Sequence, residues 1–312
     1  MLLILLLISL LPVIIWAYIF SYIDGDRLNK SRFIMGIFAG VVGVMPIIFY
    51  EQIFSFFKLS FLLSVFSTFS LISFLTFLAV FCFFVFSVSL IYTLIYKQHY
   101  KNVLFYLLKS FIYFMVLVVF VSSFLYLLDS LGLFSSFSLG EDNLTFSGTA
   151  LNSFKLILFY YVFVAFTEEL SKHTNFLGYS INYIDSVQKG VLYAIFVALG
   201  FVFIENILYL YNVLSYDNFS AEFFRVYLFR FVFSLMVHVF CSSLIAYYFS
   251  KVYIYYKKIV NFRSVKLFFT GIFLAVSFHA FFDISLTYGW SFMMIIYFLV
   301  GYFYLTGVFY KG

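Results

Sequence analysis

Long apolar runs constrain the fold of this chain more than any other feature of its sequence. Nine runs are long enough to cross the hydrocarbon core of a bilayer, which takes about 20 residues in a helix. They lie near residues 1–20, 33–50, 61–96, 103–128, 154–172, 190–214, 223–250, 266–288 and 290–310. Only 10% of all residues are charged, against roughly a quarter in soluble domains. The chain is therefore predicted to be an integral membrane protein.

The predicted fold class is all-α, a polytopic transmembrane bundle of about nine helices. A spanning segment must satisfy its own backbone hydrogen bonds, and these runs lack the alternating pattern of an outer-membrane strand. The number stays open between eight and ten, because the run 61–96 is long enough to cross once or twice.

Lysine and arginine gather in alternate loops, which sets the predicted orientation. Basic residues are concentrated at 27–32, at 97–101 and above all at 251–266, whereas 129–153 contains none. Because cytoplasmic loops carry the excess of these residues, we predict a multi-pass protein of the cell membrane with its N-terminus outside and its C-terminus in the cytoplasm. The net charge of +5 comes largely from such loops. It indicates topology and a lipid bilayer as partner, not nucleic acid.

The spans from residue 154 onward contain ionisable side chains, whereas the runs 1–20, 33–50 and 61–96 contain none. A charged side chain inside a bilayer costs at least about 2.5 kcal/mol on insertion scales, so such residues indicate a functional site. The candidates are Glu168, Glu169, Lys172, Glu205, Arg230, His238, His279 and Asp283.

The first group is Glu168-Glu169-x-x-Lys172. At helical spacing Lys172 lies one turn from both carboxylates, so it can pair with one and leave the other free. The alternative is a cluster at the cytoplasmic interface, since Lys172 lies near the end of its run. The second group is Glu205-Asn206, which has no acid or base nearer than Lys189 or Asp217 along the chain.

The third and fourth groups contain histidines. His238 follows Arg230 by two turns on the helix 223–250, which predicts a shared face. His279 and Asp283 are four residues apart, so Asp283 can orient the ring, or both can contact a metal or water. A histidine alone in a membrane helix is more often a packing residue, and a closed His279–Asp283 hydrogen bond is the structural alternative.

Three of the candidates share a membrane depth. At a rise of 1.5 Å per residue, Glu205, His238 and His279 lie roughly 22, 18 and 20 Å from the inner ends of their spans. Glu168 reaches this depth only if its helix continues past Lys172 toward Ile184.

Carboxylates and histidines gathered within a membrane support peptide hydrolysis, in which a glutamate takes a proton from water and histidines bind a metal or stabilise the oxyanion. Signatures of other intramembrane proteases, such as HExxH or GxSG, are absent from the sequence. A proton-coupled transporter is the alternative, because buried acids and histidines also form proton relays. The sequence has only two prolines and no visible repeat, which argues against a transporter fold.

Taken in order, the four groups resemble the motifs of the PrsW family of intramembrane proteases, relatives of the CAAX-prenyl-protease and bacteriocin-processing membrane enzymes. The resemblance covers about residues 154–290. We therefore predict a catalytic core at 154–312 and non-catalytic helices at 1–128, which match no motif of the family. Between them lies an external loop at 129–153, indicated by its Ser, Gly, Asn, Thr and Asp residues. The implied catalytic residues are Glu168, Glu169, Glu205, His238 and His279, supported by Lys172, Asn206, Arg230 and Asp283.

Glu168 or Glu169 is the expected general base. The resemblance leaves the cofactor open between a divalent metal such as zinc, with His238, His279 and Glu205 as ligands, and none. It implies a membrane-anchored protein substrate and site-1-type cleavage of a single-pass regulatory protein such as an anti-sigma factor.

Overall fold

The computed structural model describes residues 2–23, 30–48, 137–140, 143–146, 149–150, 154–217, 219–255 and 262–310. The expected spans 61–96 and 103–128 lie outside the described residues. The question of whether 61–96 crosses once or twice lies there too, and the total of about nine helices stays a prediction.

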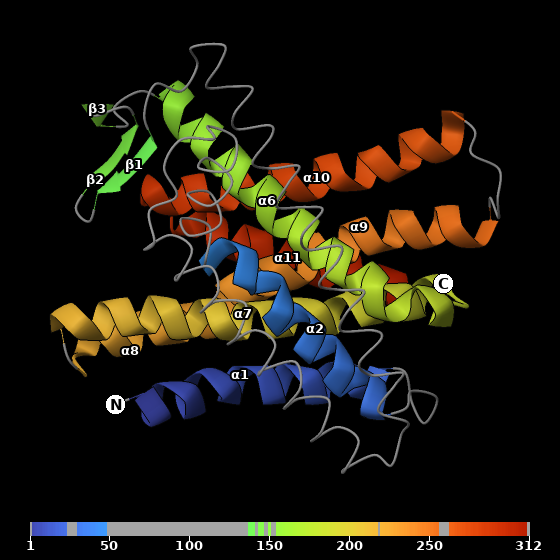
Figure 1. Cartoon of the computed structure of the whole chain (residues 1–312), viewed down its shortest axis with the longest axis horizontal. Helices are drawn as coiled ribbons and strands as arrows, with labels where there is room; N and C mark the ends of the chain where they lie inside the picture. The colour runs from blue at the N-terminus through green and yellow to red at the C-terminus, as the bar shows by residue number, and fades with distance from the viewer. Residues whose placement is uncertain are drawn as a thin grey trace, which may run out of the picture. The chain divides into compact units, whose positions relative to one another are not determined.

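Long helices occupy the described part of the bundle wherever the apolar runs predict them (Figure 1). They are α1 (Leu2–Ile23), α2 (Lys30–Ile48), α6 (Phe154–Ser180), α7 (Val187–Asp217), α8 (Ala221–Phe229), α9 (Leu235–Tyr255), α10 (Phe262–Thr287) and α11 (Phe292–Tyr310). A short 3-10 helix, Ile181–Tyr183, follows α6, and a π-helical turn, η3 (Arg230–Ser234), joins α8 to α9 without a break. Five helical segments among the described residues are long and apolar enough to cross a membrane. The protein is thus a multi-pass membrane protein.

The segment predicted to be an external loop contains a small antiparallel sheet, so the all-α class holds for the bundle alone. β1 (Phe137–Gly140) pairs with β2 (Asn143–Phe146), which pairs with β3 (Thr149–Ala150). Short alternating stretches such as Asn143–Phe146 are typical of strands, and the loop prediction overlooked them. The sheet belongs to a compact unit of residues 45–156, whereas residues 1–44 and 157–312 form the other unit.

In the unit formed by residues 1–44 and 157–312, α7 and α9 form the centre. Helix α10 packs on α9, and α1 packs on α7. The membrane-crossing windows of α7 and of α8–α9 are both 72% buried, against 28% for α1 and α11. The two central segments are therefore surrounded by protein, and α1 and α11 leave most of their apolar surface for lipid. Polar side chains on α7 and α9 consequently face other helices.

Glycines bring α2 and α7 together backbone to backbone. A Cβ added at Gly40 would lie 1.9 Å from the carbonyl oxygen of Val197, and one at Gly200 would lie 1.9 Å from that of Ile37. Small residues allow this kind of close approach between membrane helices. Ser171, next to Lys172 on α6, donates a hydrogen bond to the carbonyl oxygen of Gly43 on α2. Helix α2 therefore contacts both helices that carry the glutamates.

Candidate active site

One buried polar cluster collects all nine residues that the sequence singles out. Helix α6 continues to Ser180, which is the condition under which Glu168 and Glu169 reach the depth of the histidines. The cluster takes side chains from α6, α7, η3, α9 and α10. Its members are Glu168, Glu169, Lys172, Glu205, Asn206, Arg230, His238, His279 and Asp283.

Glu169 is the most enclosed carboxylate of the cluster. Its Oε1 accepts a hydrogen bond from Lys172 Nζ at 2.5 Å and lies 2.8 Å from His279 Nδ1. Ser242 on α9 donates to the other oxygen, Oε2, at 3.4 Å. The side chains of Glu169 and Lys172 are each only 1% exposed. Because a buried charge persists only when it is paired and hydrogen-bonded, these contacts explain how both charges are accommodated.

Glu205 on α7 holds a second group of contacts. Its Oε1 accepts from an Arg230 guanidinium nitrogen at 2.5 Å, and its Oε2 lies 2.9 Å from His238 Nε2. Arg230 Nε donates to Asn206 Oδ1 at 2.7 Å. The guanidinium also lies 4.4 Å from the ring centroid of Tyr209, a cation–π contact. Arg230 therefore contacts three side chains of α7.

The π-helical turn Arg230–Ser234 explains how Arg230 and His238 come to share a face. Eight residues of regular α-helix would leave the two side chains about 80° apart around the axis, at roughly 100° per residue. A π-turn accommodates one extra residue, so the offset falls to about 20°. The shared face predicted from the sequence thus depends on an irregularity that the sequence does not reveal.

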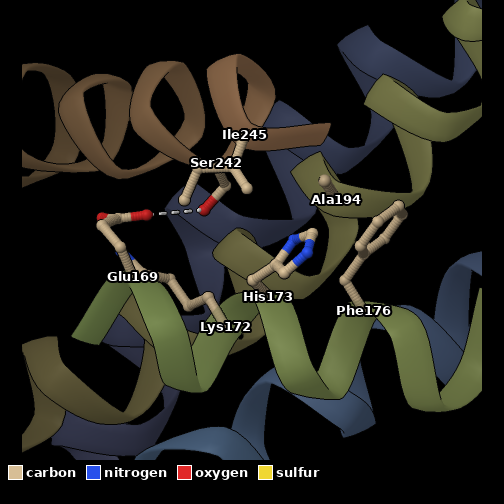
Figure 2. Close-up of a pocket in the computed structure, with 7 residues that line it drawn as sticks. All are labelled: Glu169, Lys172, His173, Phe176, Ala194, Ser242 and Ile245. Atoms are coloured by element: carbon tan, nitrogen blue, oxygen red, sulfur yellow. Dashed lines mark hydrogen bonds and ion pairs between the residues drawn. The ribbon is translucent and has the colours of Figure 1, made fainter. Parts of the chain in front are cut away.

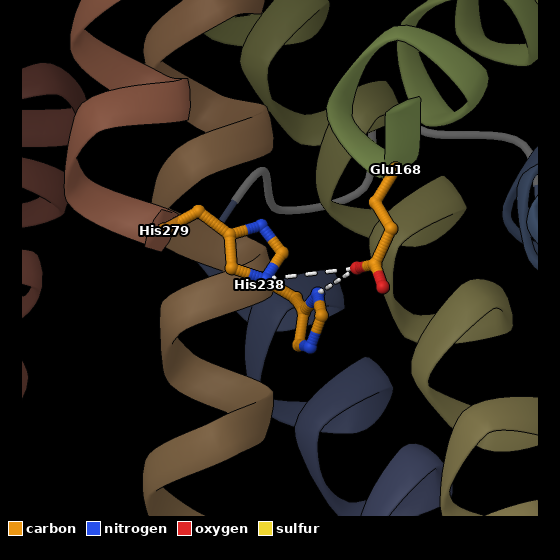
Figure 3. Close-up of side chains that lie close together, drawn as sticks. All are labelled: Glu168, His238 and His279. Carbon is orange, nitrogen blue, oxygen red and sulfur yellow. Dashed lines mark ion pairs between the residues drawn. The ribbon is translucent and has the colours of Figure 1, made fainter. Parts of the chain in front are cut away.

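Glu168 and the two histidines meet at the centre of the cluster (Figure 3). Glu168 Oε2 lies 3.9 Å from His238 Nδ1 and 3.6 Å from His279 Nε2. The two imidazole rings have centroids 4.8 Å apart and stand nearly perpendicular, at 83°. Glu168 Oε2 is buried and has no hydrogen-bond partner among the described residues. Three potential ligand atoms therefore converge, one from each side chain, all within 4.8 Å of one another.

This donor set fits a divalent metal ion. Zinc in catalytic sites takes three protein ligands from histidine and carboxylate side chains and keeps one position open. The remaining ring nitrogen of each histidine faces a carboxylate, His279 Nδ1 toward Glu169 and His238 Nε2 toward Glu205. A carboxylate only accepts hydrogen bonds, so Glu169 favours a proton on His279 Nδ1. For His238 the tautomer follows from Lys172, whose ammonium group donates to Nδ1 at 2.9 Å and so favours the proton on Nε2, although Glu205 Oε2 makes no hydrogen bond among the described residues. The lone pair of His279 Nε2 then lies on the side of Glu168, whereas that of His238 Nδ1 accepts from Lys172 Nζ.

The converging ligand atoms differ from the expected set in one member. Glu168 takes the place expected for Glu205, whose carboxylate instead lies against the outer nitrogen of His238. Asp283, expected to orient His279, has its Oδ2 3.7 Å from the ring Nε2, beyond hydrogen-bonding distance.

The cluster opens on one side. The exposed fraction of the side chain is 28% for Glu205 and 22% for Asp283, 13% for Glu168, and 1% for Glu169. Exposure therefore falls from the Glu205 and Asp283 side toward Glu169. Glu205 and Asp283 are therefore the most accessible carboxylates of the cluster.

Ser242, which donates to Glu169 at the edge of the cluster, was missed by sequence reasoning. It follows His238 by four residues, so helical spacing places it on the same face. Serine is common in membrane helices, where its hydroxyl often bonds within its own helix. The spacing was therefore available as a signal, but serine alone did not indicate function. Ser243, for comparison, donates to the carbonyl oxygen of Val239 in its own helix.

Comparison with protein families matches residues 106–308 to one described as PrsW family intramembrane metalloprotease. The matched residues include every member of the cluster and exclude α1 and α2. No curated protein and no solved structure matches the chain.

Proposed function

The chain belongs to the PrsW family of intramembrane metalloproteases, and on that premise we propose that Glu168, His238 and His279 hold a divalent metal ion at the centre of its active site. The protein is a membrane-embedded peptidase, and the reaction is hydrolysis of a peptide bond in a membrane-anchored protein. Neither the family match nor the described residues favour the alternative of a proton-coupled transporter.

The observation that carries this proposal is the carboxylate behind each histidine. Glu169 lies 2.8 Å from the outer nitrogen of His279, and Glu205 lies 2.9 Å from that of His238. Metal-binding histidines typically donate their second ring N–H to a carboxylate or carbonyl, which fixes the tautomer and the ring orientation. Two histidines that merely pack in a membrane have no need for two such carboxylates.

The ion would supply Lewis acidity to the scissile carbonyl and to the attacking water. Glu168, His238 and His279 would hold it, and three protein ligands are the usual number in catalytic zinc sites. Glu169 and Glu205 orient the two rings, and neither is the base in this scheme, because each is already paired with a cation. Lys172 and Arg230 hold those two carboxylates in their ionised, hydrogen-bonded positions.

Asp283 is the carboxylate that we assign to proton transfer. Its Oδ2 lies 3.7 Å from His279 Nε2, and the side chain is 22% exposed. It therefore lies beside the ligand cluster, on its more exposed side. A group in that position can accept a proton from water and return it to the leaving amine, since general acid–base catalysis requires reach through at most one water. This role replaces the base expected at Glu168 or Glu169.

The substrate is proposed to be a single-pass membrane protein that approaches through the outer half of the bilayer. Helix α7 ends at Asp217 and α10 ends at Thr287. In the orientation predicted from the basic loops, both ends lie outside. Asp283 is only about 6 Å from the end of α10 at 1.5 Å per residue. The open side of the cluster therefore faces the outer half of the membrane, which suits site-1-type cleavage.

Metal content and cleavage measured on the same variants test the proposal. Full-length protein in lipid nanodiscs is incubated with tagged single-pass membrane proteins, and products are sequenced to locate the cut. We expect zinc and cleavage to be lost together in His238→Ala, His279→Ala and Glu168→Gln. Asp283→Asn should keep zinc and lose cleavage. Glu222→Gln serves as control, because this acid pairs with Arg225 on an exposed surface of α8.

Retention of cleavage by the two histidine variants would contradict the proposal. Cleavage by a metal-free wild type that is unaffected by chelators would contradict the metal and leave the site itself standing.

A further inference from the structure

A small pocket lies beside Glu169 (Figure 2). Its lining comes from three helices: Glu169, Lys172, His173 and Phe176 on α6, Ala194 on α7, and Ser242 and Ile245 on α9. All of these side chains are buried. On α6 and α9 the lining residues follow Glu168 and His238 in sequence, so the pocket lies toward the C-terminal ends of these helices. None of the three proposed metal ligands lines it.

His173 presents an unpaired polar atom in this pocket. The residue is only 6% exposed, and its Nε2 is buried without a hydrogen-bond partner among the described residues. Three aromatic rings surround the imidazole at centroid distances of 5.5, 5.3 and 5.6 Å, from Phe176, Phe249 and Phe268. A buried polar group without a partner costs about 1–3 kcal/mol. An apolar residue would suit this position better unless His173 bonds something.

Two more polar atoms with spare capacity face the pocket. Glu169 Oε1 already contacts Lys172 and His279, whereas among the described residues Oε2 receives only the long 3.4 Å bond from Ser242. A carboxylate oxygen has two lone pairs, and a serine hydroxyl both donates and accepts. Figure 2 shows the His173 ring and the Ser242 hydroxyl on the same side of α6, with Glu169 next to Ser242. Three partners is the number that a buried water typically has.

We infer that this pocket binds a water molecule between His173, Ser242 and Glu169, and that the water is a reserve for hydrolysis. Each cleavage consumes one water, whose hydroxyl bonds to the carbonyl carbon as the C–N bond breaks and whose proton goes to the leaving amine. Apolar surroundings make that co-substrate scarce inside a bilayer. Glu169 connects the pocket to the reaction centre, because it also contacts His279, whose other nitrogen faces Glu168.

His173 is a positioning residue in this scheme, since it acts through the water and through Glu169. The role of the water as a reserve rests on the proposed protease function, whereas the binding site itself rests only on the pocket. Experiments can therefore contradict the reserve role without contradicting the water-binding site.

The binding site is tested by structure determination of the full-length protein in nanodiscs at a resolution that reveals ordered water. We expect density about 3 Å from His173 Nε2 in the wild type. It should persist in His173→Gln, whose amide still offers hydrogen-bonding groups, and vanish in His173→Phe. A wild-type pocket without this density overturns the inference.

The reserve role is tested by kinetics on the same variants. In His173→Phe, kcat should fall by about 10- to 100-fold, as for other outer-shell partners, with KM and zinc content unchanged. His173→Gln should recover much of the loss. Phe249→Leu is the matched control, because Phe249 contacts the His173 ring but does not line the pocket.

Equal losses in all three variants would reveal a packing role and overturn the reserve. If the wild type cleaves nothing while the water density is present, the proposed function and the reserve fail together, and the water site is supported.

Discussion

Lys172 Nζ lies 2.9 Å from His238 Nδ1, the ring nitrogen that also faces Glu168. An ammonium group only donates hydrogen bonds, so Lys172 uses the lone pair of this nitrogen. In the proposed active site a metal ion needs the same lone pair. Lys172 and the ion therefore compete for His238, while Glu169 holds the lysine at 2.5 Å.

Replacing Lys172 with Met should strengthen zinc binding and weaken the fold. Removing a positive charge a few ångströms from the ion favours zinc by at least about tenfold, since such pairs interact by several kcal/mol at intermediate dielectric constants. The same change leaves Glu169 without its cation, and breaking a buried pair costs about 3–5 kcal/mol. Zinc affinity is measured by competition with a chromophoric chelator, and stability by the melting temperature.

Lys189→Met is the control for this prediction, because Lys189 pairs with the exposed Asp185, and surface pairs contribute only about 0–1 kcal/mol. It should change neither measurement appreciably. Weaker zinc binding in Lys172→Met would mean that the lysine orients His238 for the ion and does not compete with it.

Glu169→Gln and Glu205→Gln should each weaken zinc binding by about 10- to 100-fold, the usual effect of losing a carboxylate behind a metal-binding histidine. The amide oxygen still accepts from the ring, but the negative charge that raises the basicity of the histidine is gone. The chelator competition assay reports the change directly. Glu222→Gln on α8 provides a control with the same chemistry at an exposed position. Unchanged affinity in both variants would argue against His238 and His279 as ligands.

Much of this site was predictable because ionisable side chains are rare in a membrane. Glu205, His238 and His279 could be assigned a common depth from helical rise alone. Side-chain direction required the structure. Depth and periodicity do not reveal that Glu169 pairs with Lys172 and with the outer nitrogen of His279, while Glu168 lies between the inner nitrogens of both histidines. The two possible pairings of Lys172 look alike in the sequence.

Other features could not be predicted from the sequence because they depend on contacts between distant segments. The run Arg230–Ser234 contains no glycine or proline to indicate a π-turn. Nothing in the sequence distinguishes Gly40 from other small residues of an apolar run. Its close approach to the backbone of Val197 on α7 is visible only in the structure. The helices of residues 1–128 were predicted to be non-catalytic, and the sequence did not indicate that the backbone of α2 accepts a hydrogen bond from Ser171, next to Lys172.

Changing the length of η3 should separate the effect of the π-turn on cleavage from the effect of the residues that form it. Deleting Val232 allows a regular α-helix with seven residues from Arg230 to His238, about two turns, so Arg230 keeps its direction. Inserting one alanine after Val232 should instead rotate Arg230 by roughly 100° and break its pair with Glu205. We expect the insertion to reduce cleavage at least as much as Arg230→Ala, and the deletion to reduce it less. Equal loss in both would mean that the π-turn itself is required.

Gly200→Ala should destabilise the protein and reduce cleavage. Its new methyl group would lie 1.9 Å from the carbonyl oxygen of Ile37, a backbone atom that can move only with α2. Inserting a methylene into a tight contact typically costs about 1–3 kcal/mol. Glu205 lies five residues further along α7, so a shift of this helix away from α2 also displaces the carboxylate behind His238. Melting temperature and cleavage rate should therefore fall together.

Gly307→Ala is the matched control, since an added Cβ there meets nothing within 4 Å, and alanine favours a helix over glycine by up to about 1 kcal/mol. It should keep full activity and melt at the same temperature or slightly higher. Gly40→Ala, which meets the backbone of Val197 from the opposite helix, should behave like Gly200→Ala although it lies outside the residues matched to the family. Full activity in Gly40→Ala would show that α2 does not position the glutamates of α6 and α7.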